Sequence, residues 1–305
     1  MLRVTFLGTA GALPTVNRCP SAIAVSRDGE QLLLDCGEGT QRQLMRTRSG
    51  MMNISAIFLT HLHADHILGL PGLLQTLGFN GRREPLHLYG PQGTALFADM
   101  LCEFRYTRPD FPLHTHELQP GEVAARRGYA VETFPTYHGV PSLGYALQEP
   151  ARPGRFDPER SMALGITNKR DFGRLQRGDA VQGPSGEVCP EQVMGLPRPG
   201  RRIVYTGDTL PHPGLVDACR NADLFICEAT LSRREKEHAQ ETFHCTAADA
   251  AAIAHQAGAR RLVLTHISSR YTADPTPLQE EARLVFPTAV LARDGLELEV
   301  PLRDD

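Results

Sequence analysis

The sequence predicts an α/β fold in which strands deliver metal-binding side chains to one edge of a sheet. Short apolar runs typical of buried strands recur along the chain, and several lead directly into a histidine or a carboxylate. The run 56–59 is the most informative, because it continues into Thr60-His61-Leu62-His63-Ala64-Asp65-His66. Open α/β sheets hold their ligands beyond the carboxyl ends of their strands, so this turn is a candidate metal site.

The remaining elements follow from apolar periodicity and from glycine or proline punctuation. Strands are expected at 1–8, 22–25, 31–35, 56–60, 86–90, 130–134, 202–206, 224–228 and 262–266. Helices are expected from Gln41, at about 71–79 and at about 246–256. Residues 149–200 are rich in Arg, Pro and Gly and poor in apolar side chains, which indicates an insertion, an arm or a long loop. The two β-rich halves on either side would fit a duplicated architecture.

Composition limits the class of protein. The 305 residues carry a net charge of −3, so a polyanion could be bound only by a local basic patch. The seven cysteines form no C-x-x-C pair, which favours free thiols in a reducing compartment. No apolar run reaches the length of a membrane span and Met1 opens no basic-then-apolar leader, so we expect a cytoplasmic protein without membrane partners.

The histidine turn predicts two metal ions. His61, His63, Asp65 and His66 crowd four metal-capable side chains into six positions, more than one ion needs from a single turn. Imidazole suits zinc, although histidine and carboxylate ligands leave manganese open. Similar strand-end positions are held by His138, Asp208, Glu228 and His266. Two ions roughly 3.5–4 Å apart, with Asp208 as the shared carboxylate, would activate water and clamp a displacement.

These motifs resemble the metallo-β-lactamase superfamily, whose H-x-H-x-D-H signature matches residues 61–66. More narrowly, the chain resembles ribonuclease Z (tRNase Z, short form) through most of its length. The matching segments include Asp35-Cys36-Gly37-Glu38-Gly39, Gly207-Asp208-Thr209, Glu228-Ala229-Thr230, His244-Cys245-Thr246 and His266-Ile267-Ser268-Ser269-Arg270-Tyr271. The resemblance implies a four-layer αβ/βα metallo-β-lactamase fold, a single domain over 1–305 with a flexible arm inserted at about 149–182.

The resemblance also implies a ligand set with two zinc ions per subunit. One zinc would take His61, His63, His138 and Asp208, and the other Asp65, His66, Asp208 and His266. His244, held by Glu228, would donate a proton to the leaving 3′ oxygen, and Asp65 would orient or deprotonate the water. Arg270, Thr209 and Ser268 are the candidates to bind phosphate.

The implied activity is cleavage of precursor tRNA on the 3′ side of the discriminator nucleotide, which leaves a 3′ hydroxyl on the tRNA. The implied assembly is a homodimer in which each arm presents tRNA to the other subunit's metals. Residues 149–182 carry seven basic and five acidic side chains, a modest basic excess for such an arm.

The chain departs from the family pattern at two places that concern tRNA. The family's Gly-Pro element in the arm is replaced by Thr167-Asn168-Lys169-Arg170-Asp171. The family loop P-x-K-x-R-N is replaced by Pro14-Thr15-Val16-Asn17-Arg18-Cys19, which keeps the arginine and loses the lysine. Two alternatives therefore stay open: another hydrolase of the same fold, such as a small-molecule phosphodiesterase or an arylsulfatase-like enzyme, and a non-catalytic RNA-binding protein with a structural metal site.

Overall fold

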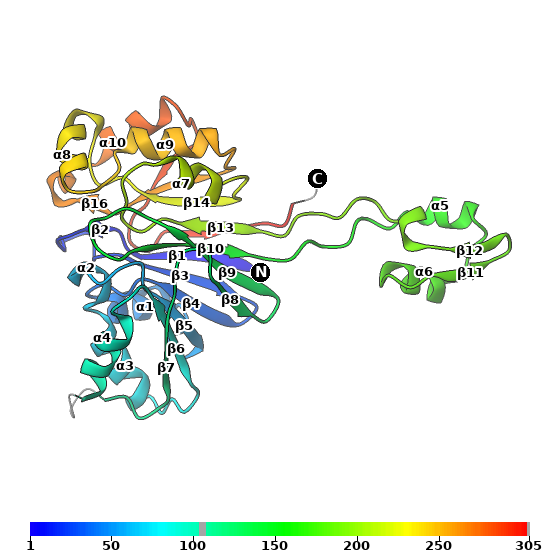
Figure 1. Cartoon of the computed structure of the whole chain (residues 1–305), viewed down its shortest axis with the longest axis horizontal. Coiled ribbons are helices and arrows are strands. Elements are labelled where there is room, and N and C mark those ends of the chain that lie inside the picture. The colour runs from blue at the N-terminus through cyan, green and yellow to red at the C-terminus, as the bar shows by residue number, and fades with distance from the viewer. Residues whose placement is uncertain (104–107, 304–305) are drawn as a thin grey trace. The chain divides into compact units, whose positions relative to one another are not determined.

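The computed structural model describes residues 1–103 and 108–303, and their contacts divide the chain into two compact units (Figure 1). Unit 1 comprises residues 1–148 and 202–301. Unit 2 comprises residues 149–201 together with residues from 302 on. Within the described ranges, no helix is long and apolar enough to cross a membrane.

Unit 1 contains two seven-stranded sheets. The first has the order β18-β1-β3-β4-β5-β6-β7, with β1 (Leu2–Gly8), β3 (Ala22–Arg27), β4 (Glu30–Leu34), β5 (Ile54–Phe58), β6 (Leu86–Gly90), β7 (Leu113–Glu117) and β18 (Glu297–Glu299). The second has the order β17-β15-β14-β13-β10-β9-β8, with β8 (Val123–Arg126), β9 (Tyr129–Pro135), β10 (Leu143–Gln148), β13 (Arg202–Tyr205), β14 (Leu224–Glu228), β15 (Leu262–Thr265) and β17 (Val290–Leu291). A short parallel pair, β2 (Ala10–Gly11) with β16 (Ile267–Ser268), lies outside both sheets.

Both sheets follow one plan. In the first, β18, β1, β3 and β4 are antiparallel and β4 to β7 are parallel. In the second, β8, β9, β10 and β13 are antiparallel and β13, β14, β15 and β17 are parallel. The repeated plan agrees with the duplicated architecture that the sequence suggested.

Three apolar cores hold unit 1 together in four layers. One core lies between the sheets and includes Phe6, Phe58 and Tyr145. A second joins the first sheet to α1 (Thr40–Thr47), α3 (Leu70–Phe79) and α4 (Thr94–Glu103). The third joins the second sheet to α7 (Pro213–Ala218), α9 (Ala247–Gln256) and α10 (Thr276–Arg283). The order helix, sheet, sheet, helix confirms the predicted four-layer fold (Figure 1).

Each predicted strand and helix of unit 1 has a counterpart within a few residues. The helix predicted at 246–256 is α9, which begins with a capping box between Thr246 and Asp249. Strands β7, β8 and β10 and the short strands β2, β16, β17 and β18 were not predicted. In β7 this is understandable, because alternate positions carry His114 and His116 rather than apolar side chains.

Unit 2 is a small folded body with a core of its own. It contains α5 (Pro158–Ala163), α6 (Lys169–Gln176) and a hairpin of β11 (Val181–Gly183) and β12 (Gly186–Val188). Its apolar core is formed by Ile166, Leu175, Val181, Val188 and Val193. Asn168, within the segment that departs from the family pattern, caps α6 by accepting a hydrogen bond from the Arg170 backbone N–H. The predicted arm begins where unit 2 begins, and unit 2 continues to Arg201.

Candidate metal centre and active site

The candidate site lies where the parallel strands of both sheets end. His61, His63, Asp65 and His66 follow β5, and His63 is the residue before α2 (Ala64–Ile67). Asp208 follows β13, Glu228 ends β14 and His266 follows β15. His138 follows β9. Each sheet therefore supplies part of the site.

Gly207 allows the two sheets to approach at this edge. Its φ is +60°, and a Cβ placed on it would lie 2.6 Å from the Cβ of Thr60. Only glycine meets both requirements at little cost. The Gly207-Asp208 pair of the sequence thus places the Asp208 carboxylate against the histidine turn.

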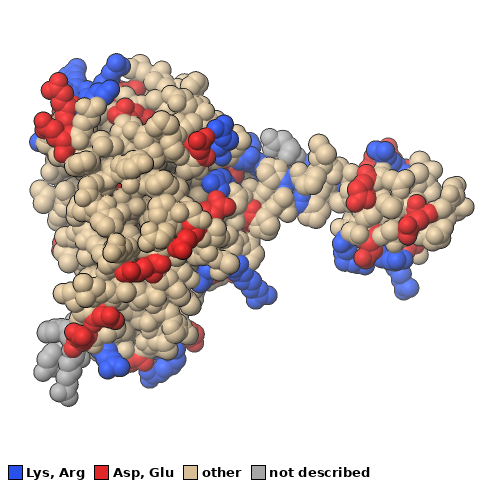
Figure 2. Space-filling model, in the orientation of Figure 1, with Lys and Arg blue, Asp and Glu red and all other residues tan. Residues whose placement is uncertain are grey.

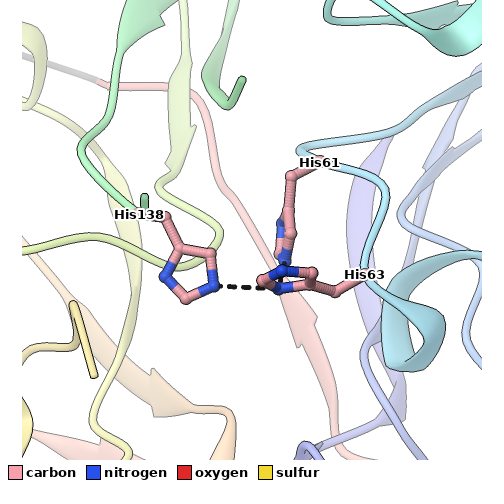
Figure 3. A group of neighbouring side chains, drawn as sticks. All are labelled: His61, His63 and His138. Carbon is pink, nitrogen blue, oxygen red and sulfur yellow. Dashed lines mark hydrogen bonds between the residues drawn. The ribbon is translucent and has the colours of Figure 1, made fainter. Parts of the chain in front are cut away.

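The first ligand group consists of three imidazoles (Figure 3). The Nδ1 atom of His63 lies 3.1 Å from Nε2 of His61 and 3.1 Å from Nε2 of His138. Burial and the neighbouring imidazoles hold the pKa of His61 well below its ordinary value, and burial also lowers the pKa of His63. Both rings are therefore neutral near pH 7, the form that binds a metal ion.

The second ligand group consists of Asp65, His66, Asp208 and His266. Nε2 of His266 lies 3.2 Å from the Asp208 Oδ2 atom and 3.3 Å from the Asp65 Oδ2 atom. Nε2 of His66 lies 3.4 Å from the same Asp208 oxygen. Two carboxylates and two imidazoles form an oxygen and nitrogen donor set that suits zinc.

Asp208 connects the two groups and tests the fit of a metal pair. Its Oδ2 atom also lies 3.8 Å from Nε2 of His61 and 3.5 Å from Nε2 of His138. Its Oδ1 atom is buried and, among the described residues, has no hydrogen-bond partner. An ionised carboxylate oxygen left this way is costly unless a cation meets it. The residues therefore fit bound metal, and Asp208 lies within reach of both ligand groups.

Burial lowers the pKa of His66, but Asp208 and Asp35 outweigh it and raise that pKa well above the ordinary value. The two carboxylates therefore stabilise positive charge at the second ligand group, either as a proton on His66 or as a metal ion that replaces this proton.

Hydrogen bonds fix the tautomers of four histidines. The Nδ1–H of His66 donates to Asp35 at 2.8 Å, that of His138 to the Phe243 carbonyl at 3.0 Å and that of His266 to Thr230 Oγ1 at 2.8 Å. The Nδ1–H of His61 donates to Thr60 Oγ1 at 3.0 Å, and this hydroxyl donates to Asp35. Each bond leaves Nε2 free to bind a metal ion.

Sequence reasoning did not assign these supporting residues. Asp35 is fully buried and also accepts a hydrogen bond from the Tyr205 hydroxyl at 2.8 Å. Its signal was present in the sequence, since Asp35 ends a strand-type run as Asp208 does. The Phe243 carbonyl had no signal, because any residue offers a carbonyl.

His244 and Glu228 form a pair beside the ligand groups. The Nδ1–H of His244 donates to Glu228, with oxygen distances of 3.0 and 3.1 Å. Glu228 is fully buried and also accepts from the Thr209 backbone N–H at 2.7 Å and from the Thr230 hydroxyl at 2.5 Å. Burial lowers the pKa of His244, but the Glu228 carboxylate outweighs it and raises that pKa to about 9. Glu228 therefore orients the His244 imidazole and favours its protonated form at neutral pH.

The three predicted phosphate contacts lie in different environments. Thr209 is buried, and its hydroxyl donates to the Leu210 carbonyl at 2.9 Å. Ser268 is half-buried and its Oγ accepts from the Arg270 N–H. Arg270 is exposed and forms an ion pair with Glu235 at 2.8 Å. A phosphate contact by Thr209 would require its internal hydrogen bonds to break, so Arg270 is the most accessible of the three.

The loop that departs from the family pattern borders the site. The Ala12 N–H donates to the Asp65 Oδ2 atom at 2.8 Å. Arg18 donates to the Thr9 hydroxyl at 2.7 Å and to the Ala292 carbonyl at 2.6 Å, while Val16 is 99% exposed. The retained arginine therefore holds the loop, and the valine in place of lysine faces solvent.

The four-layer fold and the paired His/Asp groups at its edge define a metallo-β-lactamase-type hydrolase. In agreement, a family model described as a beta-lactamase superfamily domain matches residues 183–267. A model described as anti-Pycsar protein Apyc1 matches residues 2–148.

Full-length relatives narrow this class. The chain is 50% identical to ribonuclease Z of Methanosarcina acetivorans over the whole of both chains. It is 51% identical to ribonuclease Z of Haloferax volcanii over 99% of this chain and 96% of the relative. The crystal structure of human tRNase Z, short form, superposes with a TM-score of 0.71 at 30% identity and covers 98% of this chain and all of its own. The chain belongs to the ribonuclease Z family.

Proposed function

We propose that the chain is a zinc-dependent endoribonuclease that removes the 3′ trailer from precursor tRNA by phosphodiester hydrolysis and leaves a 3′ hydroxyl on the tRNA. The observation that carries this proposal is the His244–Glu228 pair beside the two ligand groups joined by Asp208. A purely structural metal site would need neither a shared carboxylate nor a charged imidazole next to it. The full-length identity to ribonuclease Z supports RNA as the substrate.

The metal centre would be held by His61, His63, His138, Asp65, His66, Asp208 and His266. Two zinc ions bound there, or manganese in their place, would polarise the phosphate and lower the pKa of a water molecule. Burial raises the pKa of Asp65, but hydrogen bonds and charge from His266 and His66 outweigh it and hold that pKa well below the ordinary value. Asp65 is therefore ionised at neutral pH and can orient the attacking water or accept its proton.

The leaving oxygen receives its proton from His244. Glu228 holds Nδ1–H, which leaves the Nε2–H of the imidazolium as the donor. The protonated form prevails at neutral pH because the pKa is raised to about 9. A positioned acid of this kind contributes about 10²–10⁴ in rate. Arg270 and Ser268 would hold the RNA phosphates near the cut.

Unit 2 would bind the body of the tRNA, and the chain would act as a homodimer in the cytoplasm. On the face drawn in Figure 2, unit 2 shows basic and acidic side chains interspersed. Binding through its Lys and Arg side chains would weaken steeply with salt. All seven cysteines are free thiols, in keeping with a reducing compartment.

The test is cleavage of a 3′-extended pre-tRNA, compared with hydrolysis of bis(p-nitrophenyl) phosphate. We expect a single cut and a tRNA product with a 3′ hydroxyl. The His244→Ala variant should lose about 10²–10⁴ in kcat on pre-tRNA. Because p-nitrophenolate leaves without a proton, the same variant should keep most activity on the small ester. Wild-type chain that hydrolyses only the small ester would refute the RNA substrate.

A further inference from the structure

Phe243 combines two features that are unfavourable for a bulky aromatic residue. Its φ is +60°, in the left-handed region that side chains other than those of Gly, Asn and Asp rarely adopt. The residue is 42% exposed although its side chain is large and apolar. Phe243 directly precedes His244, and strained positions of this kind often mark functional sites.

The backbone hydrogen bond of Phe243 explains why the residue is held in a strained conformation, but it does not explain why its side chain is aromatic. The Phe243 carbonyl accepts the Nδ1–H of His138 at 3.0 Å, which fixes the orientation of a metal ligand. Glycine or asparagine would supply the same carbonyl with less strain. The aromatic side chain is therefore what remains to be explained.

The ring lies on the backbone next to the candidate metal ligand His138. A Cβ placed on Gly139 would be 3.3 Å from Cδ2 and Cε2 of Phe243, so one edge of the ring covers this glycine. The neighbouring Val140 is 37% exposed. Tyr137, on the other side of His138, packs its ring edge-to-face against His212 at 4.5 Å. Phe243 thus presents an exposed apolar surface over Gly139, the residue after His138, and directly before His244.

We propose that the Phe243 ring stacks on a nucleobase of one of the two nucleotides that flank the scissile phosphodiester. The inference rests on the proposed function, because His244 acts on the leaving 3′ oxygen and the bases on either side lie within one nucleotide of that atom. Single-stranded RNA bases are recognised by stacking on aromatic side chains. Such stacking tolerates any base, which suits an enzyme that meets trailers of varied sequence.

The test removes the ring from the protein and the base from the RNA, separately and together. Phe243→Asn keeps the left-handed backbone favourable and deletes the ring. Phe243→Tyr keeps an aromatic face, and Phe79→Ala is the matched control because Phe79 is 86% exposed and ends α3. The substrates are pre-tRNA, pre-tRNA with an abasic residue on the 5′ or the 3′ side of the cut, and bis(p-nitrophenyl) phosphate.

We expect Phe243→Asn to lower kcat/KM on pre-tRNA by about 5- to 150-fold, the range for loss of one stacked base. Activity on the small ester should stay within about twofold, and Phe243→Tyr and Phe79→Ala should resemble wild type. One of the two abasic substrates should lose a similar factor with wild type and little further with Phe243→Asn, because both changes remove the same contact.

Three results would overturn the inference. One is unchanged kcat/KM on pre-tRNA for Phe243→Asn. Another is an equal loss on pre-tRNA and on the small ester, which would assign the ring to holding His138 or His244 in place. The third is that, with both abasic substrates, the loss of kcat/KM from the abasic residue and the loss from Phe243→Asn multiply, which would show that the ring contacts neither base. Failure of the proposed function has a different signature, because wild type itself would then leave pre-tRNA uncut.

Discussion

Asp35 offers a sharp test of how the second ligand group is held. Its Oδ2 atom accepts from Nδ1 of His66 at 2.8 Å and from the Tyr205 hydroxyl at 2.8 Å, and its Oδ1 atom accepts from the Thr60 N–H at 2.7 Å. In Asp35→Asn the amide oxygen can keep the Thr60 bond, which leaves the NH₂ group facing His66. The His66 ring would then accept at Nδ1 and carry its proton on Nε2, the atom that faces Asp208.

The expected effect follows from losing one correctly oriented ligand. Loss of a residue that orients a metal ligand typically lowers metal affinity by about 10- to 100-fold, or about 1.4–2.7 kcal/mol. The buried Tyr205 hydroxyl also loses its acceptor, which should lower the free energy of unfolding by about 1–3 kcal/mol. The metal-free and metal-loaded chains should therefore both be destabilised, the loaded chain by more.

The assay is competition for Zn²⁺ against a fluorescent chelator, together with thermal denaturation in the presence and absence of metal. Asp223→Asn is the control, because Asp223 is also buried but accepts from the Arg202 backbone N–H rather than from a histidine. It should leave Zn²⁺ affinity unchanged. Zn²⁺ affinity of Asp35→Asn within twofold of wild type would refute the tautomer argument.

Three further predictions concern the same site. Glu228→Gln removes the charge that raises the pKa of His244 to about 9, so His244 should lose its proton at a lower pH. The alkaline limb of the pH profile of kcat on pre-tRNA should therefore move toward neutral pH. An unmoved limb would contradict the role of His244 as the acid. Removal of metal with a chelator should abolish cleavage and lower the Tm, and added zinc or manganese should restore both. Elemental analysis of the active enzyme should give two ions per chain, and one ion or fewer would contradict the paired site. Gly207→Ala should lower the free energy of unfolding, measured by urea titration, by more than about 1 kcal/mol, because φ is +60° and the new Cβ would lie 2.6 Å from the Cβ of Thr60. Gly295→Ala is the control and should lower it by less, because φ is also positive, at +81°, but the space around the Cβ is open.

The candidate ligands could be selected from the sequence because their local context is visible in the chain. Each follows or ends an apolar strand-type run, and parallel strands of one sheet end on the same side. The supporting contacts were less accessible, since Asp35 meets His66 and Tyr205 only after two sheets have packed. For Thr209 the family resemblance implied a phosphate contact, whereas its hydroxyl bonds to the neighbouring Leu210 carbonyl in the structure.

The folded core of the insertion that begins at residue 149 was also not predicted from the sequence. Its low apolar content favoured an arm or a loop, yet five well-separated side chains suffice for a small core. Pairing of β11 with β12 and capping of α6 by Asn168 then fix its backbone. Side chains spread over short elements leave little periodicity for a pattern to reveal.

The two ligand groups draw on residues that the ribosome synthesises far apart in time. His66 and His266 are separated by 200 positions, yet their Nε2 atoms lie 3.4 Å apart. At about 5–20 residues per second, His266 is added to the growing chain roughly 10–40 s after His66. During that interval β1 to β7 lack the complete second sheet that covers them, and only part of the candidate ligand set exists. The complete candidate ligand set therefore exists only in a nearly finished chain, and we expect metal binding to be a late step in folding.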